Sequence, residues 1–276
     1  MQNKVLLIGL GLIGGSIALR FKKNGYFVGG YDINETALNF GLEKGIIDEI
    51  VSDEGIKEYP FVIFALYPQA ELSFIRKKAN LFNEGTLVMD VTGVKAPFAP
   101  EIRRTLDSIG VRYISTHPMA GGEKQGVTYS RDDMFEGCNF IICPIGEQEE
   151  DVEEAKKFGK LIGASRISLC DVTKHDALIA FLSQLPHAIA VSLMTSCDDS
   201  TNLSSYTGDS FRDLTRIASI NEKMWSELFL SNKKTLVNTI DFFQRELDKL
   251  KIAIADGDRG TIEEMMVLST TRRKEF

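Results

Sequence analysis

Two patterns of apolar residues divide the chain near residue 170. Before this point, short continuous apolar runs alternate with stretches in which apolar residues recur every three or four positions. A short continuous run is typical of a parallel strand buried on both faces, and its alternation with helices predicts a doubly wound, mostly parallel sheet. The expected strands lie at 4–8, 26–31, 61–66, 86–91, 111–115, 139–143 and 165–170.

After Asp171, turn residues become rare and apolar residues recur at helical spacing. Pro186 interrupts the first of these helical stretches and should kink it. Such apolar helices need a partner surface, which is either the rest of the monomer or a second copy of the chain. We therefore expect an α/β protein, with a Rossmann domain over 1–170 followed by an all-helical dimerisation domain over 171–276.

Composition narrows the class of protein. The chain has 276 residues, 43% of them hydrophobic and 26% charged, and its net charge is −7. This balance offers no basic surface for nucleic acid or an anionic membrane. We expect no apolar run to approach the roughly 20 residues of a membrane span, and the glycine-broken N-terminus does not resemble a signal peptide. The cysteines form no CxxC pair, which favours reduced residues in a cytoplasmic protein; they are Cys138, Cys143, Cys170 and Cys197.

A glycine-rich turn follows the first expected strand. The sequence GLGLIG, in which Gly9, Gly11 and Gly14 are the motif glycines, opens a helical stretch. The glycines allow a tight turn, an approaching pyrophosphate and close helix packing, and Leu12 and Ile13 then start the helix whose N-terminus faces the phosphates. Asp32 follows the second strand, where a carboxylate binds a ribose 2′-hydroxyl and repels a 2′-phosphate. The pattern predicts NAD as cofactor.

A histidine ends the fifth long strand. His117 comes directly before Pro118 and a pair of glycines in the segment ISTHPMAGG. Ligands bind outside the carboxyl ends of strands in an open α/β sheet, so an imidazole there is a candidate acid or base. Taken alone, a histidine at this position is more often a residue that merely terminates a strand.

The helical half contains two further polar spots. His187 follows Pro186, where a kink opens local space, although a lone histidine on an apolar helix is usually a core residue. Arg212, Asp213 and Arg216 follow a glycine-containing loop, and their spacing of three and four places them near one another on a helix. A guanidinium there is suited to a carboxylate ligand, whereas a solvated Arg–Asp pair is the ordinary alternative.

Four motifs in order, GLGLIGGS, HPMAG, SQLPHAIA and SFRDLTRIA, give the chain a resemblance to the prephenate dehydrogenase family of tyrosine biosynthesis. The resemblance implies a Rossmann domain with a helical dimerisation domain, a homodimer, and NAD-dependent oxidative decarboxylation of prephenate to 4-hydroxyphenylpyruvate. Some members of the family act on arogenate instead and give tyrosine.

The resemblance also implies roles for individual residues. His117 matches the catalytic histidine, which accepts the proton of the substrate hydroxyl, and Arg216 matches the arginine that binds a substrate carboxylate. His187 matches a histidine of the substrate pocket. Glu123 and Asp213 match acids around that pocket with gating or arginine-orienting roles, and Trp225 matches a position at its rim.

Two positions depart from the family pattern. In the segment DVTGVK, Gly93 stands where the family commonly has a serine that bonds to substrate and histidine. Thr92 could replace that hydroxyl, a backbone N–H or water could serve, or the bond is missing. Asp209 stands where a small residue is expected, and its carboxylate is either a ligand for the ammonium of arogenate or a solvated loop acid.

Other readings remain open from sequence alone. Arogenate is the alternative substrate, and a non-catalytic NAD-binding sensor is the alternative from another functional class. A β-hydroxyacid dehydrogenase would need a catalytic lysine in a glycine-rich helix, which the second half lacks. No metal site is expected, because the histidines are far apart in sequence, and His175 is interpreted as structural. The end of the chain at Phe276 leads us to expect no regulatory or mutase domain.

Overall fold

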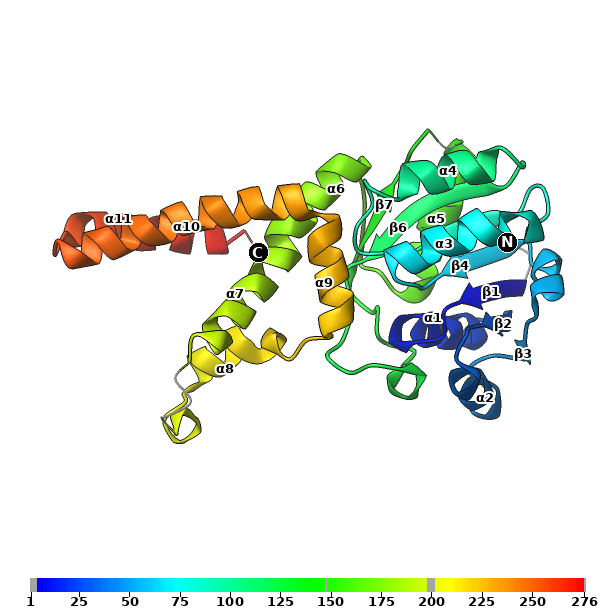
Figure 1. Ribbon diagram of the computed structural model, residues 1–276, viewed down its shortest axis with the longest axis horizontal. Coiled ribbons are helices and arrows are strands. Elements are labelled where there is room, and N and C mark those ends of the chain that lie inside the picture. The colour runs from blue at the N-terminus through cyan, green and yellow to red at the C-terminus, as the bar shows by residue number, and fades with distance from the viewer. Residues whose placement is uncertain (1–3, 147, 198–201, 276) are drawn as a thin grey trace.

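The computed structural model describes residues 4–146, 148–197 and 202–275, and one sheet organises its first half (Figure 1). The strand order is β3-β2-β1-β4-β5-β6-β7-β8. Neighbouring strands run parallel throughout the described sheet except β6 and β7, which are antiparallel. The strands are β1 (Lys4–Ile8), β2 (Phe27–Tyr31), β3 (Glu49–Ile50), β4 (Phe61–Phe64), β5 (Leu87–Asp90), β6 (Arg112–Pro118), β7 (Asn139–Cys143) and β8 (Arg166–Leu169).

Helices cover both faces of this sheet, as the alternating pattern predicts. They are α1 (Leu12–Lys23), α2 (Glu35–Glu43), α3 (Pro68–Lys78), α4 (Ala99–Asp107) and α5 (Glu149–Ile162). Phe21 of α1 and Phe158 of α5 stack in one core layer, with ring centroids 5.9 Å apart. Ile75 of α3 and Ile102 of α4 belong to the layer on the other face. The predicted doubly wound α/β fold is therefore confirmed, with the short strand β3 as an unpredicted addition.

The second half is helical and extends away from the sheet (Figure 1). Its elements are α6 (Val172–Ile179), a π-helical turn η4 (Ala180–Gln184), α7 (Leu185–Thr195), α8 (Asp209–Thr215), a 3₁₀ turn η6 (Arg216–Ala218), α9 (Glu222–Ser231), α10 (Lys233–Ala255) and α11 (Arg259–Arg273). Pro186 lies in the first turn of α7, directly after the π turn. A π turn accommodates the proline ring and its missing N–H, so the helix changes its winding there without ending.

The expectation about apolar runs needs a correction. The continuous helical stretch Val172–Thr195 is long and apolar enough, by length and composition, to cross a membrane. Three polar side chains of this stretch are nevertheless buried inside the protein, namely His175, Asp176 and Gln184. Gln184 donates to the carbonyl of Leu228 at 3.1 Å and accepts from Asn232 at 2.9 Å. These internal bonds tie the stretch to α9 and to the start of α10, whereas only 28% of its apolar 18-residue segment is buried inside the protein.

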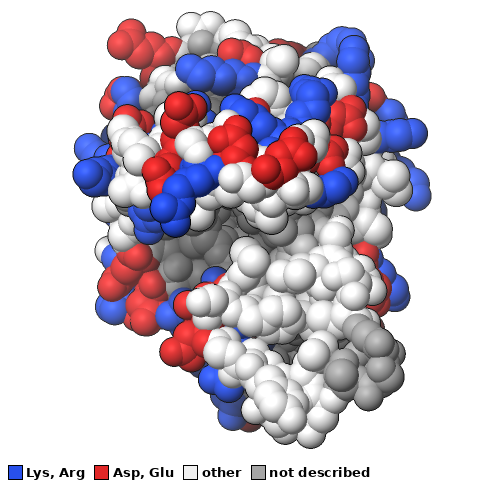
Figure 2. All heavy atoms as spheres, turned by 90° about the vertical axis from the view of Figure 1, so that its left-hand side faces the viewer, with Lys and Arg blue, Asp and Glu red and all other residues white. Residues whose placement is uncertain are grey.

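Charge is unevenly distributed over the end of the helical half. Figure 2 shows Lys, Arg, Asp and Glu gathered in the upper part and along the lower left of this view, with a broad uncharged area at the lower right. In Figure 1 the paired helices α10 and α11 lie at the upper height and α8 at the lower. Exposed apolar side chains of α7, the turn before α8, and α8 include Met194, Tyr206 and Leu214.

Candidate active site

The glycine-rich turn between β1 and α1 has the shape that an anion requires. Gly9 has φ +99°, and a Cβ on Gly14 would lie 1.9 Å from the carbonyl oxygen of Gly9. A Cβ on Gly11 would meet nothing within 4 Å, so the space above this residue is open. Gly11 also precedes α1 without a side-chain cap, which leaves the first N–H groups of the helix available. The residues present therefore fit the pyrophosphate of a dinucleotide.

Asp32 is held beside that turn at the end of β2. One carboxylate oxygen accepts the backbone N–H of Leu10 at 2.6 Å, and the other accepts that of Asn34 at 2.8 Å. The first bond fixes the carboxylate against the glycine turn. Asp32 thus has the position expected of a group that binds the ribose hydroxyls of NAD.

His117 lies at the carboxyl end of β6, on the same edge of the sheet. The loop after it reaches α1, because a Cβ on Gly122 would come within 3.2 Å of Leu12 Cδ2. The Nδ1 atom of His117 is 2.9 Å from Nε2 of His175, on α6. Burial lowers the pKa of His117 well below 6.5, and His175 and Lys95 lower it further. The imidazole is therefore neutral near pH 7.

A buried charge network supports the end of β6 from β5. The ammonium group of Lys95 donates to Asp90 at 2.7 Å, to Thr92 Oγ1 at 3.1 Å and to the carbonyl of Thr116. The hydroxyl of Thr92 donates in turn to Asp90. Because this hydroxyl is occupied inside the network, Thr92 does not supply the missing serine hydroxyl at His117.

Gly93 is the residue that faces the imidazole. A Cβ at this position would lie 3.9 Å from both Cε1 and Nε2 of His117 and 3.6 Å from Leu228 of α9. These are ordinary van der Waals distances, so a small side chain would fit. Gly93, in place of the serine common in the family, therefore leaves open space next to Nε2 of His117, the ring nitrogen that faces away from His175.

The predicted arginine is brought near one of the two predicted acids. Arg216 donates to Glu123, in the loop after β6, at 2.6 Å. Asp213 is exposed and forms no side-chain hydrogen bond or ion pair with Arg216 in the described structure, although helical spacing suggests that pair. Nη1 of Arg212 instead lies 3.6 Å from Oδ1 of Asp209, whose side chain is 95% exposed. Asp209 thus points into solvent.

His187 forms an aromatic wall with the single tryptophan. Its ring stacks on Trp225 of α9, with centroids 3.7 Å apart, and Phe229 packs edge-on against Trp225. Nδ1 of His187 donates to the carbonyl of Ser183 at 2.8 Å. Burial is the main cause that lowers the pKa of His187, and Arg216 adds to the effect. A neutral His187 contributes shape and one hydrogen-bond acceptor to the site.

His175 is the functional neighbour that sequence reasoning missed. It was interpreted as structural, yet it contacts the candidate base directly and is itself completely buried. A local signal did exist, because His175 and Asp176 come in the first turns of the first helix after the sheet. Only the fold shows that this helix crosses the edge where β6 ends.

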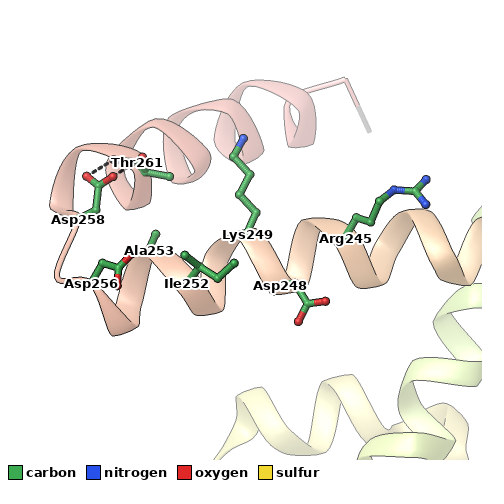
Figure 3. A pocket seen from close by; sticks show the side chains of 8 residues that line it. All are labelled: Arg245, Asp248, Lys249, Ile252, Ala253, Asp256, Asp258 and Thr261. Carbon is green, nitrogen blue, oxygen red and sulfur yellow. Dashed lines mark hydrogen bonds between the residues drawn. The ribbon is translucent and has the colours of Figure 1, made fainter.

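Two open grooves of the helical half lie away from these residues. One has a volume of about 470 Å³ and lies between α10 and α11 (Figure 3). Its lining residues are Arg245, Asp248, Lys249, Ile252, Ala253, Asp256, Asp258 and Thr261. The groove contains none of the predicted site residues, and we assign it no part in the chemistry.

Comparisons with known proteins match nearly the whole chain to one family. Residues 17–168 match the family described as prephenate dehydrogenase, nucleotide-binding domain, and residues 171–268 match prephenate dehydrogenase, dimerization domain. The chain is 31% identical over 269 residues to prephenate dehydrogenase of Bacillus subtilis, covering 94% of this chain and 72% of the relative. It is also 31% identical over 270 residues to that of Lactococcus lactis, covering 95% and 74%.

A solved structure is similar over the full length. The prephenate dehydrogenase of A. aeolicus, in complex with hydroxyphenyl propionate and NAD+, superposes with a TM-score of 0.90 at 28% identity. The match covers 100% of this chain and 99% of the other.

Proposed function

The chain belongs to the prephenate dehydrogenase family, and we propose that it oxidises and decarboxylates prephenate to 4-hydroxyphenylpyruvate with NAD, using His117 as the base. The observation that carries the assignment of the base is the position of the His117 imidazole, at the end of β6 and on the sheet edge that also holds the dinucleotide turn, and burial that lowers its pKa supports the assignment. A sensor that only binds NAD would not need this group.

The balance of the reaction defines what His117 does. The hydroxyl proton on C4 of prephenate moves to the imidazole as hydride leaves C4, and the pair of electrons from the C1–carboxylate bond enters the ring as CO₂ departs. The oxygen on C4 becomes a phenol when His117 returns the proton, so the complete reaction releases no net proton. NAD, when bound, supplies the hydride acceptor. Aromatisation provides driving force, and the protein supplies proton transfer and orientation.

The cofactor would be held by the first half of the chain. We assign the pyrophosphate to Gly9, Gly11 and Gly14 with the backbone of Leu12 and Ile13, and the ribose to Asp32. The open space above Gly11 and the uncapped start of α1 support the first assignment. The absence of an arginine directly after Asp32 favours NAD over NADP.

Arg216 is the group we assign to a substrate carboxylate. Its guanidinium has five N–H donors, and Glu123 engages only part of this donor set. Because the Arg216–Glu123 pair is largely exposed, an entering carboxylate can compete with Glu123 for the guanidinium. Glu123 therefore orients the empty site and moves aside when it is filled, whereas Asp213 has at most an indirect part.

His187 and Trp225 would enclose the substrate ring. The neutral imidazole is suited to a wall of the pocket and not to anion binding, which leaves that task to Arg216. Arogenate differs from prephenate by an ammonium group. The solvent-facing position of Asp209 gives this ammonium no buried partner there, which favours prephenate.

We also propose a homodimer formed by the helical half, with the domain division between residues 170 and 171. Strand β8 ends at Leu169 and α6 begins at Val172, which supports the division. The apolar side chains exposed on α10 and α11 support the dimer. The four free cysteines are consistent with a cytoplasmic location.

The substitution His117→Asn tests the assignment of the base. We expect the turnover number for prephenate to fall by about 10²- to 10⁴-fold, because the asparagine amide has no basic lone pair of comparable strength. The dissociation constant for NAD, measured by fluorescence titration, should remain the same. A variant that keeps most of its turnover would contradict the assignment.

A further inference from the structure

The polar contacts of His117 continue into the helical half. His117 Nδ1 is 2.9 Å from His175 Nε2, and His175 Nδ1 is 2.7 Å from Asp176 Oδ1. Asp176 accepts the backbone N–H groups of Lys95 and Ala96 at 2.9 Å and 2.8 Å. His175 and Asp176 are both buried, so water does not compete for these bonds. The chain of contacts runs from a carboxylate on α6 to the imidazole at the end of β6.

We propose that His175 and Asp176 are positioning residues that fix the proton of His117 on Nδ1 and present its Nε2 lone pair to the substrate. This proposal deepens the proposed function and rests on it, because it takes His117 to be the base. It gives a mechanistic role to a histidine whose neighbours in the sequence suggest only a structural one.

The donors and acceptors allow one consistent arrangement of protons. The carboxylate of Asp176 receives two backbone N–H groups and is an acceptor only, so Nδ1 of His175 must carry a proton. Nε2 of a neutral His175 is then an acceptor, and His117 must donate to it from Nδ1. The remaining nitrogen of His117, Nε2, has a free lone pair and faces Gly93.

The opposite arrangement would require a buried cation. If His117 accepted at Nδ1, His175 would have to carry protons on both nitrogens. Burial is the largest effect on the pKa of His175 and lowers it, and the positive charge of Lys95 acts in the same direction. Asp176 and Asp90 oppose this shift without reversing it. The neutral pair, in which His117 donates and His175 accepts, therefore has the lower free energy.

The same contacts help His117 during proton transfer. When Nε2 takes the hydroxyl proton, His117 becomes a cation that still donates from Nδ1 to His175. A hydrogen bond from a charged donor is stronger than one from a neutral donor, which offsets part of the cost of a buried charge. Lys95 is the nearby cation that opposes this charge, and the Leu228 side chain of α9 beside Gly93 adds none.

The decisive variant is His175→Phe, which keeps an aromatic ring but removes the acceptor. We expect the turnover number for prephenate to fall by about 10- to 100-fold, by analogy with the loss of a group that orients a metal-bound histidine. The Michaelis constant and the NAD dissociation constant should change little. His175→Gln is the matched control, because its amide oxygen can reach the place of Nε2 and should restore most of the turnover.

A spectroscopic measurement reads the proton position without catalysis. The chain has three histidines, so ¹⁵N-histidine NMR of the NAD-bound wild type and its variants can assign each ring. We expect His117 to be protonated on Nδ1 and unprotonated on Nε2 at pH 7.5, with this tautomer lost in His175→Phe. A proton on Nε2 in the wild type, or full turnover of His175→Phe, would overturn the proposal. If the wild type fails to oxidise prephenate, the proposed function fails, while the spectrum still decides the tautomer.

Discussion

The two halves of the molecule differ in how completely they bury their apolar residues. In the first half, the strands and the covering helices enclose two continuous core layers on the two faces of the sheet. The buried hydrophobic residues of the described helical half are few, namely Ile179, Ala180, Leu185, Ala190, Leu236 and Ala253. Many of its large apolar side chains are exposed instead, among them Phe181, Leu182, Leu230, Val237, Phe242, Leu247, Ile252, Ile254, Met266, Val267 and Leu268.

This difference matches a division of tasks. The first half has its own core and holds the glycine-rich turn and the proposed base, His117, on one edge of the sheet. The second half lacks a complete core of its own, and to the proposed site it contributes Arg216, the aromatic wall of His187 and Trp225, and His175 beside the proposed base. Because these groups lie on helices whose exposed apolar faces we propose to be buried by a second copy, we infer that assembly and substrate binding are linked.

Of the tests of this difference between the halves, we expect the largest effect when a charge is placed on the exposed apolar face of α10. Phe242 of α10 is 56% exposed, and Phe242→Asp would place a carboxylate in the expected dimer interface. We expect the dimer dissociation constant to rise about 100-fold, close to 2.7 kcal/mol, because an unpaired charge is costly to bury. Analytical ultracentrifugation over a concentration series measures the change.

Gln244→Asp is the matched control for that variant. Residue 244 is on the same helix and is already polar and exposed, so an acid there should leave the dimer unchanged. If Phe242→Asp assembles as the wild type does, this face of α10 is not the interface.

A second test concerns Glu71, a carboxyl group buried in the otherwise apolar core of the first half. Glu71 of α3 is completely buried, and neither of its carboxylate oxygens has a hydrogen-bond partner in the described structure. Burial raises its pKa well above 4.5, and Asp90 adds to the shift. A carboxyl group whose pKa is higher in the folded protein than in the unfolded chain contributes to stability at pH values below its unfolded pKa. This contribution is lost as the pH rises from the unfolded pKa through the folded pKa.

Glu71→Gln removes the ionisable group and should therefore remove this loss of stability at higher pH. The stability of the variant relative to the wild type should increase with pH above 4.5, by at most about 1.4 kcal/mol per pH unit. Urea unfolding of both proteins at pH 5.5 and pH 7.5 measures the difference. A constant difference between the two pH values would show that Glu71 is ionised in the folded protein.

The smallest effect should come from Gly93→Ser, which sharpens the assignment of the base in the first half. The added Cβ would lie 3.9 Å from His117 Nε2 without a close contact, so its hydroxyl can reach both the imidazole and the substrate oxygen. One added hydrogen bond of about 1 kcal/mol would raise turnover by roughly fivefold. Gly93→Ala provides the control for the side chain without the hydroxyl. An equal turnover in both variants would contradict this role.

Sequence predicted the parts of this molecule that depend on local pattern. The glycine turn, Asp32 and the alternation of strands and helices follow from short-range rules. The strand that ends near His117 was also expected, and the structure extends it to Pro118. Helix and strand periodicity is set by neighbours in sequence, which explains this success.

Contacts between the halves could not be predicted in the same way. His117 and His175 are separated by 58 residues, and their bond depends on where α6 crosses the sheet edge. Arg216 pairs with Glu123 across 93 residues, although local spacing pointed to Asp213. The occupation of the Thr92 hydroxyl depends on Lys95, whose buried ammonium group has no signature in the sequence pattern. Such pairs depend on how segments that are distant in the sequence pack against one another.

The initial rate of NADH formation tests the central claim most directly. Prephenate and arogenate should be compared, each with NAD and with NADP, under the same conditions. The account predicts rapid turnover of prephenate with NAD, slower turnover with NADP because of Asp32, and a weaker reaction with arogenate. The absence of NADH formation from both substrates in a folded, NAD-binding protein would contradict the assigned reaction.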